Sequence, residues 1–303
     1  MRVVAPAYYR SFACIASACR HNCCIGWEVD VDEGSLERYS NMKHPYAENI
    51  RSSIEGESPH FLLSAQERCP HLDVSGLCRI ITECGEESLC QICRDHPRYR
   101  NYYDGAVEIG LGLSCEEAAR LALDSEVGFI VSDSEDMSRT EYFSEYPAEL
   151  FSEEESGILA EKKRLISLIC DRSLPVERRI DILLPKRPCV DEIKALFLSL
   201  DTLDNEWKSR IKTLSANDFV LDLEKNSVMI ERILCAFVYR HVCCESFYEP
   251  SSVGAFAALS ALVIAALSST PEDFYDVVRA YSAEVEYSVE NTEKMLDFLE
   301  EFI

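Results

Sequence analysis

The sequence predicts a mainly α protein, in which a small, irregular, cysteine-rich metal-binding domain with short strands precedes a helical bundle. Ten of the fifteen cysteines fall within the first 115 residues of the 303-residue chain, and apolar residues recur at helical spacing through the second half. An apolar fraction of 47% is enough to bury one large core or two ordinary ones. We therefore expect a cysteine-rich cluster-binding domain at residues 1–125 and a helical domain at residues 126–303.

The N-terminal third has few segments with regular periodicity. Residues 27–32 alternate apolar and charged side chains, which indicates a short strand, and a short helix is expected near residues 35–39. Residues 44–76 are polar and carry several prolines and glycines, so we expect them to be mostly loop, whereas residues 106–113 predict another strand. A region with so little regular structure would gain folding free energy from a bound metal.

The remainder of the chain has the spacing of packed helices. Ser114 and Glu117 have the form of a capping box, which predicts that a helix begins there. Seven more helices are predicted by apolar periodicity, at residues 158–170, 176–184, 193–200, 228–242, 253–267, 274–281 and 295–302. The longest apolar run, residues 253–267, is shorter than the ~20 residues that span a bilayer. We interpret it as a buried helix and expect no membrane contact.

Charge and cysteine usage narrow the classes of partner and compartment. A formal net charge of -24 makes nucleic acid an unexpected partner, because phosphate recognition depends on clustered Lys and Arg. The N-terminal residues lack the uninterrupted apolar stretch of a signal peptide, so we expect a cytoplasmic protein. In a reducing compartment, clustered cysteines indicate metal ligands or redox groups rather than structural disulfides.

The N-terminal cysteines form two blocks that could converge on one centre. Thiolates are soft ligands that select zinc or an iron–sulfur cluster, and four of them typically hold either group. The spacing matches neither a zinc ribbon nor the bacterial ferredoxin run, and the number of cysteines exceeds four. The candidate metal ligands are Cys14, Cys19, Cys23, Cys24, Cys69, Cys78, Cys90, Cys93 and Cys115. The later cysteines, in apolar helical surroundings, are expected to be inert core residues: Cys170, Cys189, Cys235, Cys243 and Cys244.

Three blocks of residues resemble the flagellin lysine N-methylase family, called FliB. They are Phe12-x-Cys14-x4-Cys19-x3-Cys23-Cys24-x-Gly26-Trp27, then Cys69-Pro70-x-Leu72-x5-Cys78-x11-Cys90-x2-Cys93-Arg94-x2-Pro97-Arg98, and Leu113-Ser114-Cys115-x-Glu117-Ala118-Ala119-Arg120. Weaker similarity continues to residues 286–291. The chain departs from the family pattern at Gly110-Leu111-Gly112, where Ser-x-Ser is expected, and at Glu116, where Pro is expected. The cysteine pattern also resembles small zinc- or iron-chelating proteins.

The resemblance implies a methyltransferase that moves a methyl group from S-adenosylmethionine to protein lysine side chains. Its implied substrate is a protein with exposed lysines, with flagellin as the candidate. It also implies an iron-sulfur cluster, 4Fe-4S in type, held by the N-terminal cysteines, with zinc as the alternative. A second hypothesis is a non-catalytic zinc or iron-sulfur protein with a structural or redox-sensing role.

The segment between the last two cysteine blocks holds the candidate catalytic groups. Methyl transfer to lysine requires a neutral amine aligned with the methylsulfonium, and a carboxylate or tyrosine hydroxyl can orient that amine. We predict Glu108 and Tyr102 as catalytic residues, and Arg94 and Arg98 as cofactor-binding residues. The alternative is that the two arginines only cover the cluster and balance thiolate charge, and that Glu108 is an exposed strand carboxylate. A glycine-rich nucleotide fingerprint is absent from the sequence.

Overall fold

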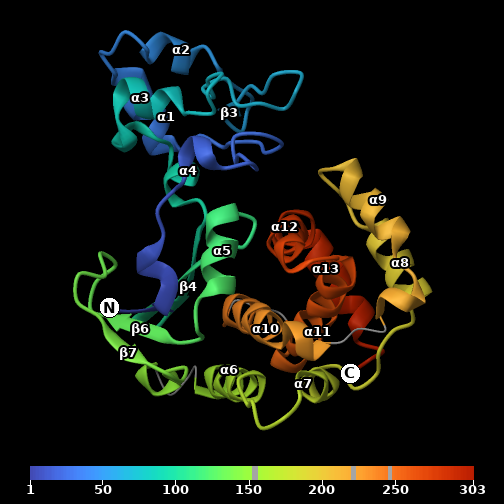
Figure 1. Ribbon diagram of the computed structural model, residues 1–303. Coiled ribbons are helices and arrows are strands. Elements are labelled where there is room, and N and C mark those ends of the chain that lie inside the picture. The colour runs from blue at the N-terminus through green and yellow to red at the C-terminus, as the bar shows by residue number, and fades with distance from the viewer. Residues whose placement is uncertain (152–155, 220–222, 245–247) are drawn as a thin grey trace. The chain divides into compact units, whose positions relative to one another are not determined.

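The computed structural model describes residues 1–151, 156–219, 223–244 and 248–303 (Figure 1). The chain forms two compact units. The helical unit comprises Met1–Phe12, Tyr99–Ser114 and Ala118–Ile303, and the cysteine unit comprises Ala13–Arg98 and Cys115–Glu117. This division differs from the predicted boundary at residues 125 and 126, because the first strand of the chain pairs with strands that follow the cysteine unit.

A mixed five-stranded sheet lies in the helical unit. Its strands are β1 (Arg2–Pro6), β4 (Arg98–Tyr103), β5 (Ala106–Leu111), β6 (Phe129–Ser132) and β7 (Glu141–Phe143), in the order β4-β5-β1-β6-β7. The central strand β1 runs parallel to β5 and antiparallel to β6. Because side chains alternate along a strand, Val107 and Ile109 pack on one face of the sheet with Val3 and Ala5, and Glu108 lies on the other.

The predicted strand at residues 106–113 is confirmed, whereas the predicted strand at residues 27–32 is wrong. All six residues of β5 are buried. Residues 27–32 contribute only an isolated bridge at Asp30 before the next helix begins. Strands β1, β6 and β7 were not predicted, because each is short and lacks apolar alternation.

The helical unit is built from nine α-helices within the described residues, and all seven helices predicted from residues 158–302 are present. They are α5 (Glu116–Asp124), α6 (Ser156–Ile169), α7 (Val176–Leu183), α8 (Val190–Ser199), α9 (Asn205–Thr213), α10 (Ser227–His241), α11 (Pro250–Leu267), α12 (Pro271–Tyr281) and α13 (Val289–Leu299). Helix α9 was not predicted, because only Trp207 and Ile211 of its nine residues are buried. The prediction of a mainly α chain is therefore confirmed.

Helix α11 lies at the centre of the helical unit, beside α10 (Figure 1). By length and composition it is the one described helix that could cross a membrane, yet 78% of its apolar window is buried in the fold. Its buried residues run without interruption from Val253 to Ala265. The prediction of a buried core helix is confirmed.

The cysteine unit contains short elements around a small core. They are α1 (Glu33–Asn41), α2 (Ala47–Arg51), β2 (Ile54–Glu55), β3 (His60–Phe61), α3 (Arg79–Cys84) and α4 (Gln91–Asp95). The short helix predicted near residues 35–39 is confirmed as α1. Aliphatic and aromatic side chains, among them Tyr39 and Phe61, form most of this core, and Cys69 and Cys90 are buried among them.

The two glycines that depart from the family pattern make room for tyrosine rings. A Cβ at Gly110 would lie 2.3 Å from the Tyr99 hydroxyl, and one at Gly112 would lie 1.7 Å from the Tyr287 hydroxyl. The centres of the same two rings lie 4.9 Å (Tyr99) and 4.3 Å (Tyr287) from the central carbon of the Arg240 guanidinium. Close approach of these rings therefore requires the absence of a side chain at both positions.

We predict that Gly112→Ala destabilises the helical unit by about 1–3 kcal/mol, because the new methyl group must displace the half-buried Tyr287 ring. Urea unfolding of the reduced protein measures the change. The matched control is Gly157→Ala in α6, where a Cβ meets nothing within 4 Å. That variant should be neutral or more stable by up to about 1 kcal/mol. Equal effects of the two substitutions would contradict this packing role.

Candidate functional site

Backbone pairing brings the two cysteine blocks together. The amide of Cys69 donates to the carbonyl of Cys24 at 2.8 Å, and the amide of Gly26 donates to the carbonyl of Glu67 at 2.9 Å. Between them, Ile25 and Arg68 form an isolated antiparallel bridge. Segments far apart in the sequence are thereby held side by side, with Cys24 and Cys69 at their contact.

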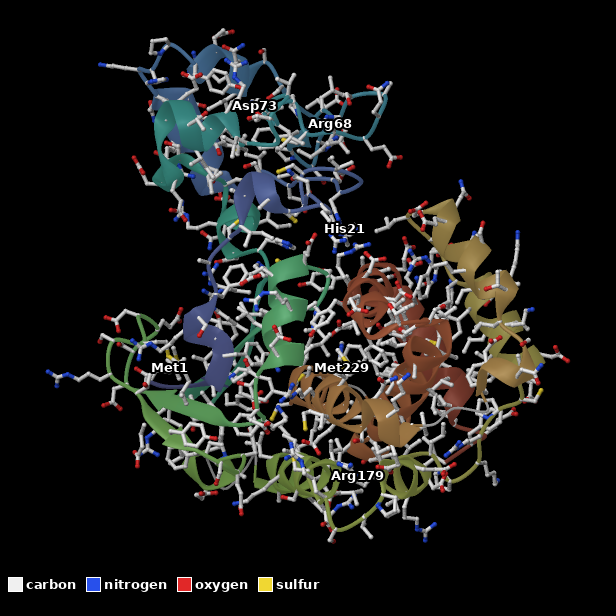
Figure 2. The ribbon with its side chains drawn as sticks, in the orientation of Figure 1. Met1, His21, Arg68, Asp73, Arg179 and Met229 are labelled. Carbon is white, nitrogen blue, oxygen red and sulfur yellow. The ribbon has the colours of Figure 1, made fainter. Side chains whose placement is uncertain are left out.

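A tight loop returns the chain from Cys69 to Cys78. The carboxylate of Asp73 accepts hydrogen bonds from the amides of Ser75 (2.8 Å) and Leu77 (2.9 Å), and these bonds lower the pKa of Asp73. Arg68 donates to the Asp73 carbonyl at 3.3 Å, and both residues are labelled in Figure 2. The loop closes with a bridge between Leu72 and Cys78, just before α3 begins.

Thiol–thiol contacts centre on Cys24 and Cys69. The Cys24 thiol lies within hydrogen-bonding reach of Cys23 and Cys69. These contacts lower the pKa of Cys23 to about 7 and also lower the pKa of Cys69, while the pKa of Cys24 is raised. Burial raises the pKa of Cys78, and the nearby charges of Cys69 and Cys23 raise it further. Four of the predicted ligands, two from each block, therefore influence one another directly.

A second thiol pair lies at the start of α4. Cys90 precedes the helix and Cys93 lies in its first turn, where the two side chains hydrogen-bond and the pKa of Cys90 is lowered. The contact with Cys90 and burial are the main causes that raise the pKa of Cys93. The charges of Cys69 and Cys78 raise it further. The second pair is thus coupled to the first. Asp32 fixes this end of α4 by accepting from the amide of Gln91 at 2.8 Å.

The remaining predicted ligands lie nearer the surface. Cys14 is exposed, and Cys19 and Cys115 are half-buried. The Cys19 thiol donates to Glu116 at 3.8 Å, and the same carboxylate binds Arg20 and His21, each at 3.1 Å. Glu116, which replaces the expected proline, therefore anchors the first cysteine block.

The donor set of the cysteine unit suits a thiolate-bound metal or cluster. All fifteen cysteines are free thiols, and six of them are linked through the contacts around Cys69. Over the described ranges, however, no group of three or more His, Cys, Asp or Glu side chains is arranged to hold a metal ion. The choice of ligands stays a prediction.

The two arginines predicted to bind a cofactor lie at the end of the cysteine unit. Arg94 donates to the carbonyls of Leu89 (3.1 Å) and Glu87 (3.3 Å), which form the turn that leads into Cys90. Arg98 is half-buried at the first position of β4. The bonds of Arg94 favour the alternative of an arginine that supports the thiol segment, and a cofactor role for either residue stays a prediction.

Glu108 lies in a buried ion pair, so the alternative of an exposed strand carboxylate is wrong. The ammonium of Lys162, on α6, lies 2.8 and 2.7 Å from the two Glu108 oxygens, and both side chains are 0% exposed. Tyr103 also donates to Glu108 at 2.8 Å, and Tyr146 donates to its other oxygen. The carboxylate is therefore fully occupied by groups of the protein itself.

Three tyrosine rings surround the Lys162 ammonium. It lies 5.2 Å from the ring centre of Tyr239, 5.4 Å from that of Tyr146 and 5.9 Å from that of Tyr103. It also donates to the Tyr239 carbonyl at 3.0 Å. Burial and the Glu108 charge raise the pKa of Tyr146 and Tyr239, which keeps both phenols neutral. Sequence reasoning missed Lys162, although it lies on the apolar stripe of α6.

The structure does not bring the two predicted catalytic residues together. Asn101 and Tyr103 of β4 both donate to Glu108, whereas Tyr102, between them, points to the opposite face of the sheet. Tyr102 is 55% exposed. Its hydroxyl is open to solvent, while Glu108 is not.

The chain is similar in sequence to proteins of known name. Curated lysine N-methylases of Salmonella typhimurium and Salmonella choleraesuis are each 29% identical to the chain over 146 residues. The chain is similar to lysine N-methylases. The match covers 46% of this chain and 36% of each relative, so the chain spans about a third of the length of those lysine N-methylases.

The flagellar biosynthetic protein FliU of Salmonella muenchen is 28% identical over 152 residues, which is 48% of this chain and 90% of FliU. The resemblance predicted from the cysteine blocks is therefore confirmed. No family model and no solved structure matches the chain.

We predict that Lys162→Met destabilises the protein by about 3–5 kcal/mol, because it leaves the Glu108 charge buried without a partner. Adding Glu108→Gln should recover much of this loss, because the amide is neutral, its oxygen can still accept from one tyrosine hydroxyl, and its NH2 group can donate to the other. The surface control Lys163→Met, which removes an exposed ion pair to Glu149, should cost about 0.5 kcal/mol or less. Denaturant unfolding measures all three. A mild effect of Lys162→Met would contradict a buried ion pair.

Asp32 makes a pH-dependent contribution to the cysteine unit. Burial would raise its pKa, but hydrogen bonds from Ser35 and Gln91 outweigh it and lower the pKa to about 2. The contribution is complete above the unfolded pKa of about 3.9 and is lost as pH falls through about 2. We therefore expect the melting temperatures of wild type and Asp32→Asn to converge between about pH 5 and pH 2. Glu37→Gln on α1 is the control. A difference in melting temperature between wild type and Asp32→Asn that stays constant with pH would refute the pH-dependent role of Asp32.

Proposed function

We propose that the chain is a lysine N-methylase-like protein that transfers methyl groups from S-adenosylmethionine to lysine side chains of a flagellin-type protein. Similarity to curated lysine N-methylases and to a flagellar protein supports this assignment. The observation that carries it is the meeting of both cysteine blocks around Cys24 and Cys69, because those blocks bear the resemblance.

We propose that these thiols hold an iron-sulfur cluster, with zinc as the alternative metal. Cys23, Cys24, Cys69 and Cys78 are the candidate ligands from the first contact group, and Cys90 and Cys93 are close enough to influence it electrostatically. An iron without a protein thiolate would offer an open position for the amino and carboxylate groups of S-adenosylmethionine.

The proposed reaction is a polar methyl transfer. The lone pair of a neutral lysine amine forms a C–N bond to the methyl carbon while the S–C bond breaks, so S-adenosylhomocysteine leaves and the new ammonium releases a proton to solvent. The protein's part is alignment and desolvation of the amine. A net charge of -24 would attract lysine-rich segments of a substrate protein. Tyr102 is the exposed candidate for orienting the amine.

A non-catalytic metal-binding protein is the second candidate. It is favoured by the bonding of two predicted site residues, because Arg94 supports the turn before Cys90 and Glu108 is neutralised by Lys162. In this reading the metal only stabilises the small core of the cysteine unit, in which Cys69 and Cys90 are buried.

Binding and transfer assays on the 303-residue chain prepared without oxygen distinguish the two functions. We expect calorimetry to detect binding of S-adenosylmethionine, and mass spectrometry to detect methyl-lysine on added flagellin. Cys69→Ser should abolish both signals, because Cys69 contacts thiols of both blocks. Cys189→Ser, at an exposed cysteine of the helical unit, is the control and should retain them.

Absence of binding heat, together with an unchanged melting temperature on adding S-adenosylmethionine, would contradict the methylase and favour the non-catalytic protein. Binding without transfer to flagellin would retain the cofactor assignment and exclude this substrate.

A further inference from the structure

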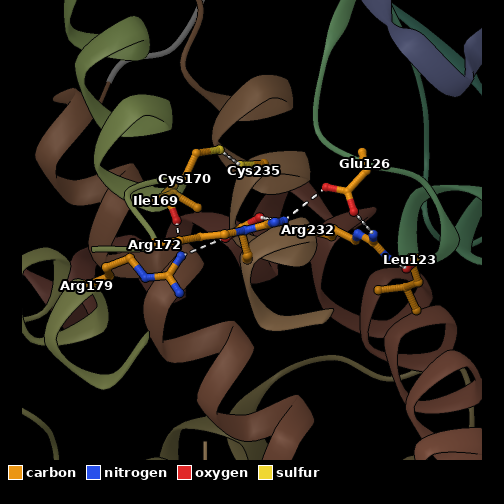
Figure 3. Close-up of polar contacts among 9 residues, drawn as sticks. Leu123, Glu126, Ile169, Cys170, Arg172, Arg179, Arg232 and Cys235 are labelled. Carbon is orange, nitrogen blue, oxygen red and sulfur yellow. Dashed lines mark hydrogen bonds and ion pairs between the residues drawn. The ribbon is translucent and has the colours of Figure 1, made fainter. Parts of the chain in front are cut away.

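Two cysteines expected to be inert core residues meet in the helical unit. Cys170 directly follows α6, Cys235 lies in α10, and their sulfur atoms are 3.6 Å apart (Figure 3). Cys170 is half-buried and Cys235 is 6% exposed. The two cysteines are 65 positions apart in the sequence, so their contact arises from the packing of α6 against α10 and could not be found from periodicity.

Charged side chains surround this thiol pair. Glu231, one turn before Cys235, accepts from Arg172 at 2.9 Å and from Arg179 at 2.8 Å. Arg179 also donates to the carbonyl of Ile169, the residue before Cys170, and so neutralises part of the negative end of α6 (Figure 3). Two guanidinium groups therefore lie beside the sulfurs, against one buried carboxylate.

A small cavity lies beside Cys235, the buried residue of the pair. Its volume is about 30 Å³, and Cys235, Arg232, Glu126 and Tyr239 contribute to its lining. Glu126 and Arg232 form an ion pair of 3.1 Å there. A space of this size holds one water-sized molecule between polar partners. Cys170 does not line this cavity, but it is half-buried and is therefore the more accessible residue of the pair.

We propose that Cys170 and Cys235 are a redox-active dithiol that hydrogen peroxide converts to a disulfide linking α6 to α10. In the first step the Cys170 thiolate attacks one peroxide oxygen, the S–O bond forms, the O–O bond breaks, and water leaves after protonation. In the second step the Cys235 thiol attacks the sulfenic sulfur, the S–S bond forms, and a second water leaves with its proton. Two thiols and one peroxide thus give one disulfide and two waters.

The electrostatics agree with Cys170 as the attacking residue. The hydrogen bond from Cys235 lowers the pKa of Cys170 and outweighs the opposite effect of burial. The charge of Glu231 raises this pKa, and the charges of Arg172 and Arg179 lower it. The pKa of Cys235 is raised, first by the contact with Cys170 and then by burial. The more exposed sulfur is therefore the one that more readily forms a thiolate, and the buried one resolves the sulfenic acid.

Formation of the disulfide would shorten the sulfur–sulfur distance from 3.6 Å to about 2.05 Å. The same two helices carry the Lys162 contact to the Tyr239 carbonyl. A disulfide between Cys170 and Cys235 would therefore covalently link α6 to α10, the two helices that the Lys162 hydrogen bond also connects.

Peptide mapping of the whole chain tests the proposal without any substitution. Trypsin should release residues 165–172 and residues 233–240, and each peptide contains a single cysteine of the pair. After treatment of the reduced protein with a small excess of hydrogen peroxide and alkylation of free thiols, we expect these two peptides to be recovered joined. Dithiothreitol should separate them.

The variants identify the roles of the two sulfurs. With Cys235→Ser, peroxide should leave a sulfenic acid at Cys170 that dimedone traps, whereas Cys170→Ser should greatly reduce trapping at Cys235. Cys189→Ser should leave the joined peptides unchanged. Recovery of residues 165–172 and 233–240 as separate alkylated peptides after peroxide treatment of wild type would overturn the proposal, as would attachment of either to peptides of the N-terminal cysteines.

Discussion

The hydrogen bond between the Cys69 amide and the Cys24 carbonyl is the contact on which the candidate site depends. It joins two cysteine blocks that are distant in sequence, and the bonds of Asp73 then return the chain to Cys78. The cysteine unit has only short helices and a two-stranded hairpin, and its core is small, with Cys69 and Cys90 buried among aliphatic and aromatic side chains. A small core of this kind gains little from apolar burial alone, which is why a bound metal or cluster would contribute substantially to its stability.

The helical unit contains a buried charged group that is stabilised by an ion pair and hydrogen bonds. Glu108 lies on a strand in which all residues are buried, and its charge is tolerated because Lys162 and two tyrosine hydroxyls satisfy both oxygens. The pair connects the sheet to α6, and the bond from Lys162 to the Tyr239 carbonyl extends the connection to α10. One polar contact thus ties three elements of the unit together, and the Cys170–Cys235 pair lies on two of them.

Sequence reasoning succeeded where the determining interactions are local. Helical periodicity located α6 to α8 and α10 to α13, because the spacing of apolar residues records the burial of each helix. It missed α9, whose surface is mostly polar, and the short strands β1 and β6, which gain their partners only in the sheet. The cysteine blocks indicated a common site, but the pairing of Cys24 with Cys69, like that of Glu108 with Lys162, depends on residues far apart in the chain and has no local signal.

The central claim is that the gathered thiols hold an iron-sulfur cluster, and metal and acid-labile sulfide analysis of protein prepared without oxygen tests it most directly. We expect a brown protein with broad absorption at the blue end of the visible spectrum. Iron and sulfide should be present in equal amounts, about four of each per chain for a 4Fe-4S cluster. Cys69→Ser should lower both values, since Cys69 joins the two blocks. A colourless protein that holds zinc without sulfide, or one that holds neither metal, would contradict the claim.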